Sequence, residues 1–131
     1  MLLRQRNSIF HMLFGEQAET ARKLAPERLL RWSDCFDRWV KHRTEVSQEA
    51  GRMAVRAWDE LLTLLHKPPW EIEEGDVLAY NGWLKTKPAG PFKITRRVRA
   101  LAMFYQWAEK ELGEGVKDPT LGIERSTNCC T

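Results

Sequence analysis

Four basic side chains lie close together in the last third of the chain. Lys93, Arg96, Arg97 and Arg99 place four positive charges, and no negative one, within seven residues. Ammonium and guanidinium groups at this density neutralise phosphates and release the counterions that surround a nucleic acid. The chemistry that these residues predict is therefore binding of a phosphate backbone. The alternative is that they form the solvated start of a charged helix.

The segment that carries these charges has the apolar spacing of an α-helix. Its apolar side chains fall on one face and are Ile94, Val98, Leu101, Tyr105, Ala108 and Leu112. At about 100° per residue, the opposite face carries Arg96, Arg99, Gln106 and Lys110. We predict a helix that begins near Lys93, ends at Gly113, buries one side and offers its basic N-terminal end to phosphates.

The bulk composition sets limits on the class of protein. A chain of 131 residues with 43% hydrophobic residues can form one domain, or one domain with an extension. The net charge is only +3, so composition alone does not imply a nucleic-acid partner. The charge is unevenly placed, however: residues 93–112 hold five basic and two acidic side chains, whereas residues 68–92 hold two basic and four acidic ones. Positive charge is thus focused on part of the surface.

Cysteine and histidine spacing argues against a disulfide framework or a metal site. The three cysteines are Cys35, Cys129 and Cys130, and none forms a zinc-type spacing with a histidine. The acidic residues Glu71, Glu73, Glu74 and Asp76 are better explained by a helix N-terminus than by a metal or acid–base site. No apolar run has the length of a membrane span, and residues 1–14 do not resemble a signal peptide. We expect a cytoplasmic protein without a cofactor or metal.

The rest of the chain predicts further helices joined by short loops, so the expected fold class is all-α. Residues 9–14 predict a short helix before Gly15, and a longer one spans about 27–43 after Pro26. Ser47 is a suitable N-cap for a helix that continues to about His66. Within it, Gly51 predicts close approach of a neighbouring helix or of a DNA backbone, and Glu60 predicts an i, i+4 pair with Arg56. Residues 74–85 predict one more helix.

Three segments in order resemble a known family. They are SQEAGRMAVRAWDELLTLLHKPPWEIEEGDVLAYNGWL, KITRRVRALAMFYQWAEKE and DPTLGIER. Together they are similar to the N-terminal core-binding domain of tyrosine recombinases, the phage integrase family, over residues 47–125. The resemblance implies a SAM-like bundle of about four to five short helices, preceded by an N-terminal extension at 1–46 and followed by a tail at 126–131.

The resemblance implies a function in DNA recombination and integration. In that family the core-binding domain lies on one side of duplex DNA and clamps it against the catalytic domain, in a bacterial, phage or mobile-element context. Its implied partners are double-stranded DNA and other recombinase protomers. Carried over by position, the DNA-binding residues are Lys93, Thr95, Arg96, Arg97 and Arg99, with Arg52 and Arg56 as additions on one face of the Ser47 helix.

The catalytic residues of the family are not expected in this chain. They are an arginine, a lysine, a His-x-x-Arg pair and a tyrosine nucleophile. His42 and Arg43 do not form that pair, and Tyr80 and Tyr105 fall in apolar helix stripes. We therefore expect a DNA-binding module that is not itself an enzyme, either a fragment of a recombinase or a stand-alone derivative.

The alternative function is a helical protein-interaction module with no direct DNA contact. It would use residues 1–14 and the segment from Trp32 to Trp39, with the basic helix merely solvated. Most tryptophans are nevertheless better explained as core residues, because they fall on apolar helix faces; these are Trp32, Trp39, Trp58 and Trp83. Met103 and Trp107 lie off the main stripe, where we expect the Trp32–Trp39 helix to cover them.

Overall fold

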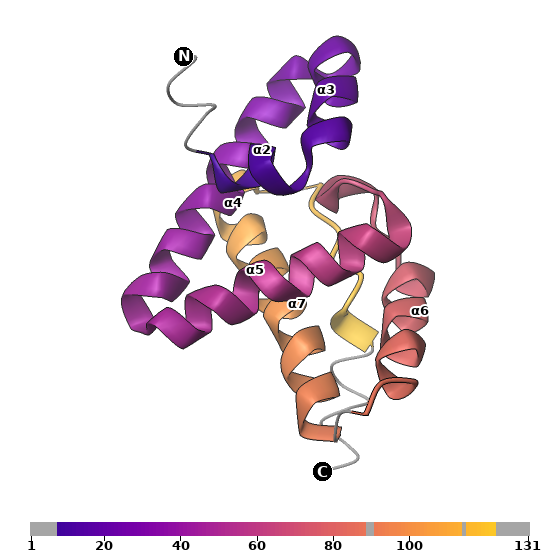
Figure 1. Ribbon diagram of the computed structural model, residues 1–131. Coiled ribbons are helices and arrows are strands. Elements are labelled where there is room, and N and C mark those ends of the chain that lie inside the picture. The colour runs from indigo at the N-terminus through magenta and orange to yellow at the C-terminus, as the bar shows by residue number, and fades with distance from the viewer. Residues whose placement is uncertain (1–7, 89–90, 114, 123–131) are drawn as a thin grey trace.

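Three long helices pack against one another around an aromatic core (Figure 1). The computed structural model describes residues 8–88, 91–113 and 115–122, apart from the side chains of residues 91–93. Within these ranges the helices are α2 (Ile9–Leu13), α3 (Gly15–Leu24), α4 (Pro26–Val46), α5 (Gln48–Leu65), the 3-10 helix η1 (Pro69–Glu71), α6 (Glu74–Lys85) and α7 (Pro91–Leu112). The described residues contain no strand, so the predicted all-α class is confirmed. None of these helices is long and apolar enough to cross a membrane.

Large aromatic side chains from α4, α5 and α7 form the centre of the core. The Phe104 ring of α7 lies 5.3 Å from Trp39, 5.3 Å from Trp58 and 5.4 Å from Phe36, measured between ring centroids. Edge-to-face contacts of this kind stabilise a core beyond the area they bury. Trp39 and Trp58 are buried as predicted, whereas Trp32 and Trp83 are only partly buried. The core therefore contains residues from both sides of position 46, where the N-terminal extension was expected to end.

The first two helices are part of this core. Phe10 and Phe14 are fully buried, stack on each other at 4.5 Å, and contact Phe36. The backbone amide of Phe10 donates to Asp37 Oδ1 of α4 at 2.8 Å, which ties α2 to α4. Helix α3 was not predicted. It buries only Ala18 and Ala21, and such small side chains give a weak apolar pattern.

Local capping residues fix the ends of the later helices. Ser47 caps α5 by accepting from the Ala50 amide at 3.0 Å, as its residue type predicts. Glu73 and Asp76 form a reciprocal capping box at the start of α6, whose bounds match the prediction. Helix α7 begins two residues earlier than predicted, at Pro91, and Gly113 follows its end with φ of 81°.

The corner between α4 and α5 depends on Gly51. A Cβ at this position would lie 3.0 Å from the Cα atom of Thr44, too close for the backbone of α4. The predicted close approach is therefore made by a neighbouring helix. Near the same end of α4, the His42 ring lies 5.0 Å from that of Trp107, so α4 partly covers this α7 side chain, as expected.

Leu101 gives a direct test of the assigned core face of α7. Its side chain is fully buried, so Leu101→Ala should destabilise the protein by about 2–5 kcal/mol through lost burial and a residual cavity. Leu30→Ala is the matched control, because Leu30 is 61% exposed and should cost less than about 0.5 kcal/mol. Urea unfolding measures both. Equal, small effects would mean that the faces of α7 are assigned wrongly.

Asp37 should make stability depend on pH. Burial raises the pKa of its carboxyl, although hydrogen bonds from Ser8 and Phe10 lower it in part. The folded state therefore binds this proton more tightly than the unfolded state, and the resulting stabilisation is lost as pH rises above about 4. Asp37→Asn keeps an acceptor for Phe10 and removes the titration. Its stability relative to the native chain should rise across that pH window in urea unfolding, and a difference that does not change with pH would contradict this role of Asp37.

Candidate nucleic-acid interface

The structure separates the predicted DNA-binding residues of α7 by exposure. Arg96 and Arg99 are exposed, and Thr95 is partly buried. Lys93 lies within α7, but its side chain is outside the described part of the structure. Arg97 differs from all of these, because its side chain is only 1% exposed. The prediction that Arg97 contacts DNA is therefore wrong.

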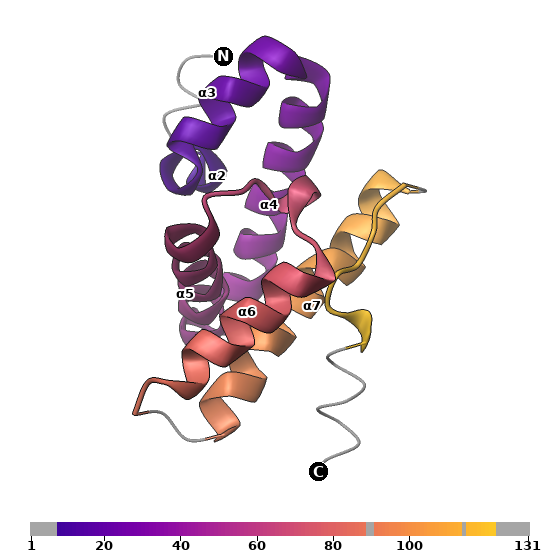
Figure 2. The ribbon, with the colours of Figure 1, turned by 90° about the vertical axis from the view of Figure 1, so that its right-hand side faces the viewer.

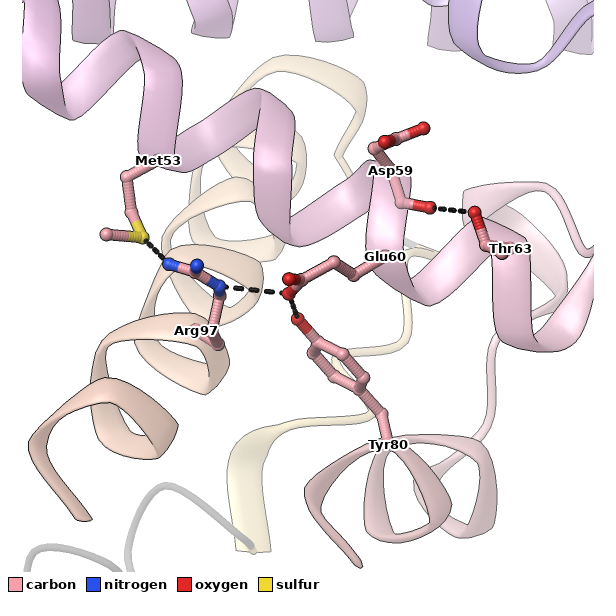
Figure 3. Close-up of polar contacts among 6 residues, drawn as sticks. All are labelled: Met53, Asp59, Glu60, Thr63, Tyr80 and Arg97. Atoms are coloured by element: carbon pink, nitrogen blue, oxygen red, sulfur yellow. Dashed lines mark hydrogen bonds and ion pairs between the residues drawn. The ribbon is translucent and has the colours of Figure 1, made fainter. Parts of the chain in front are cut away.

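Arg97 instead belongs to a buried polar network that joins three helices (Figure 3). Its Nε donates to Glu60 Oε1 of α5 at 2.9 Å, and its Nη1 contacts Met53 Sδ of the same helix. The hydroxyl of Tyr80 from α6 donates to the same Glu60 oxygen at 2.7 Å. A buried guanidinium is tolerated only when a counter-charge compensates its lost hydration. Glu60 supplies that charge, and the predicted pair of Glu60 with Arg56 is replaced by this one.

A sequence signal for the burial of Arg97 does exist. Arg97, Leu101, Phe104 and Ala108 follow i, i+4, i+7 and i+11 spacing, and the last three are fully buried. Arg97 therefore occupies the first position of the stripe that enters the core. A charged side chain at such a position predicts a buried ion pair, but the identity of its partner depends on tertiary structure.

The two tyrosines of the chain have structural roles. Tyr80 is bound to Glu60, and burial together with that hydrogen bond raises its pKa. Tyr105 donates its hydroxyl to the Pro69 carbonyl oxygen at 2.6 Å, and complete burial raises its pKa well above the ordinary value. Neither hydroxyl is exposed to an incoming phosphate.

Exposed basic residues gather where α6 ends and α7 begins. No acidic residue occurs from Val77 to Ala108, and the basic residues in that span are Lys85, Lys87, Lys93, Arg96, Arg97 and Arg99. Lys85 and Lys87 are exposed, and Lys87 Nζ lies 4.6 Å from the centroid of the Trp83 ring. Figures 1 and 2 show the end of α6 and the start of α7 at the same end of the molecule. We call Lys85, Lys87, Arg96 and Arg99 the basic end.

The acidic residues of α6 lie at its other terminus. Glu73, Glu74 and Asp76 cap its start, and Asp76 Oδ2 binds Lys67 Nζ at 2.9 Å. The capping hydrogen bond from the Glu73 amide and the Lys67 ammonium lower the Asp76 pKa, although burial acts against them. Lys85 and Lys87 were not predicted as part of a basic surface, because residues 68–92 carry a negative net charge. In the structure, the acidic and the basic residues of this segment lie at opposite ends of α6.

Arg52 and Arg56 lie on α5, and both are exposed. Arg52 Nη2 donates to Gln48 Oε1 at 3.3 Å, one turn earlier. Both arginines line a groove formed by residues of α2, α4 and α5, and α7 contributes no described residue to its lining. Arg96 and Arg99 are not among the residues that line this groove.

Comparisons of this chain with protein-family models, with curated proteins and with solved structures find no match. Across the described ranges, no three histidine, cysteine, aspartate or glutamate side chains gather as metal ligands would. What the described residues provide is a helical end with exposed ammonium and guanidinium groups. Such an end can bind the phosphates of a polyanion.

The buried network should respond to removal of the Glu60 charge. Glu60→Gln keeps the size of the side chain but leaves the Arg97 guanidinium buried without a counter-ion, so it should destabilise the protein by about 3 kcal/mol. Adding Arg97→Met should restore most of that stability, because the unpaired charge is gone. Glu45→Gln, at an exposed position of α4, is the matched control. Urea unfolding of the four chains measures these effects, and an unchanged Glu60→Gln chain would show that the pair is not formed.

Proposed function

We propose that this chain binds double-stranded DNA through its basic end, as a core-binding module of a tyrosine recombinase binds DNA. One observation carries the proposal: the span from Val77 to Ala108 has no acidic residue, and its exposed basic residues belong to the end of α6 and the first turns of α7, which lie at the same end of the molecule. Duplex binding without strand cleavage is the proposed activity. Other protomers on the same DNA are the further partners that this proposal implies.

The proposed mechanism is phosphate neutralisation by several cations at once. Arg96 and Arg99 lie within the first three turns of α7, whose N-terminal dipole also attracts anions. Lys85 and Lys87 approach from the end of α6. Because each neutralised phosphate releases condensed counterions, the affinity should fall steeply as salt rises. Contacts of this kind position a protein on DNA and carry no sequence information of their own.

The buried network supports the proposal by holding the two basic segments in place. Arg97 lies between Arg96 and Arg99 in sequence, and its bond to Glu60 orients α7 so that these two side chains face outward. Tyr80 attaches α6 to the same carboxylate, five residues before Lys85. The spacing of the four exposed cations is therefore set by a shared anchor, which reduces the entropy that DNA binding would otherwise cost.

The structure reduces the support for the alternative, a protein-interaction module that uses its aromatic segments. Phe10 and Phe14 of the first segment are fully buried, and Trp39 of the second is 2% exposed. These rings pack against the core of the same chain. They do not form the exposed aromatic patch that such a module would need.

Charge reversal at the basic end tests the proposal. Arg96→Glu with Arg99→Glu should weaken binding of a fluorescein-labelled duplex by at least about tenfold, because two phosphate contacts are replaced by repulsion. The slope of log affinity against log salt should also become shallower by about 2. Fluorescence anisotropy at several salt concentrations measures both quantities.

The matched control is Lys23→Glu with Lys41→Glu, which makes the same change in net charge at exposed positions of α3 and α4. Its affinity should stay close to that of the native chain. Equal losses in the two variants would show that only the total charge matters. An unchanged affinity of the Arg96 and Arg99 variant, with its fold intact, would exclude this end as the DNA contact.

A further inference from the structure

A groove between α2, α4 and α5 combines an apolar floor with a basic rim. It encloses about 690 Å³, open to solvent, between α2, α4 and the first half of α5. Ile9, Val40 and Val55 supply its aliphatic side chains, one from each of these helices.

The charged residues that line this groove are two arginines and one aspartate. Arg52 and Arg56 are exposed and four residues apart, so their guanidinium groups lie on the same side of α5. Asp59 is the single acidic residue among those that line the groove. Gln48 orients Arg52 by accepting from its Nη2 at 3.3 Å. Two forked donors spaced one helical turn apart match two carboxylates that are also one turn apart.

The walls of this groove are held in place by contacts with the core. Val40 is 3% exposed, and Thr44 Oγ1 donates to the Val40 carbonyl oxygen at 2.8 Å. Gly51 lets α4 and α5 approach closely at this corner. The α2 wall is tied down by the Phe10 amide bond to Asp37. Little ordering free energy is therefore needed when a partner enters.

We infer that this groove docks an acidic amphipathic helix of a partner protein, whose aliphatic side chains enter the floor while two carboxylates bind Arg52 and Arg56. The charge of the rim selects the acidic partner, and the aliphatic floor distinguishes a peptide from DNA, since a phosphate backbone has no apolar side chains to bury. Both features belong to one continuous lining. The inference is independent of the proposed DNA contact, because the two surfaces share no residue.

A display library of random peptides, selected on the native chain, tests this inference. Selected sequences should be enriched in aliphatic residues at helical spacing, with two acidic residues four apart. Fluorescence polarisation should then show that Arg52→Glu with Arg56→Glu binds the selected peptides at least about tenfold more weakly. Val55→Asp, which places a carboxylate in the floor, should weaken them as well. Lys23→Glu with Lys41→Glu, the control of equal charge, should bind as the native chain does.

Three results would overturn the inference. One is a selection without an acidic and aliphatic pattern, and another is unchanged peptide affinity in the Arg52 and Arg56 variant when circular dichroism shows it folded. The third is a loss of duplex binding in that variant as large as in the Arg96 and Arg99 variant, which would make the groove a nucleic-acid surface. Since Arg96→Glu with Arg99→Glu should leave peptide binding intact, failure of one proposal is distinguishable from failure of the other.

Discussion

The bond between the buried Arg97 guanidinium and the Glu60 carboxylate is the interaction on which the arrangement of α5, α6 and α7 depends. Burying either charge without the other would cost several kcal/mol. In the folded chain, α5 and α7 must therefore pack so that the two charges are in contact. Tyr80 binds the same carboxylate and adds α6 to the junction. The residues on either side of Arg97 are then directed to the surface, which is how one helix both enters the core and exposes Arg96 and Arg99.

The same junction explains the polarity of the molecule. Helix α6 has its acidic capping box at its N-terminus and Lys85 at its C-terminus. Its C-terminal end lies at the same end of the molecule as the start of α7 (Figure 1). Basic residues from two helices therefore add to one local field, although the net charge of the whole chain is only +3. The groove beside Arg52 and Arg56 shares no lining residue with the basic end and combines its charge with aliphatic side chains. Charge at the basic end suits a polyanion, whereas the groove suits a partner that is both acidic and apolar.

Much of the fold could be predicted because local signals and tertiary structure agree. Ser47, the capping box at α6 and Gly113 fixed helix ends close to their predicted positions, and the apolar stripes placed Trp39, Trp58 and Leu101 in the core correctly. Helix α3 was missed because alanines bury little surface and produce a weak pattern. Arg97 was assigned to the surface because its charge outweighed its position on the stripe. Its partner Glu60 is 37 residues away, and no local pattern identifies such a pair.

Backbone amide chemical shifts during titration with a duplex would test the central claim most directly, because they locate the contact on the folded chain. The largest changes should fall on Lys85, Lys87, Thr95, Arg96 and Arg99, with the amides from Gln48 to Asp59 nearly unchanged. Shifts centred on the α4 and α5 corner, or no shifts at low salt, would contradict it. In that case the buried Arg97 and Glu60 pair would still organise the fold, but the end of the molecule that it shapes would not be where DNA binds.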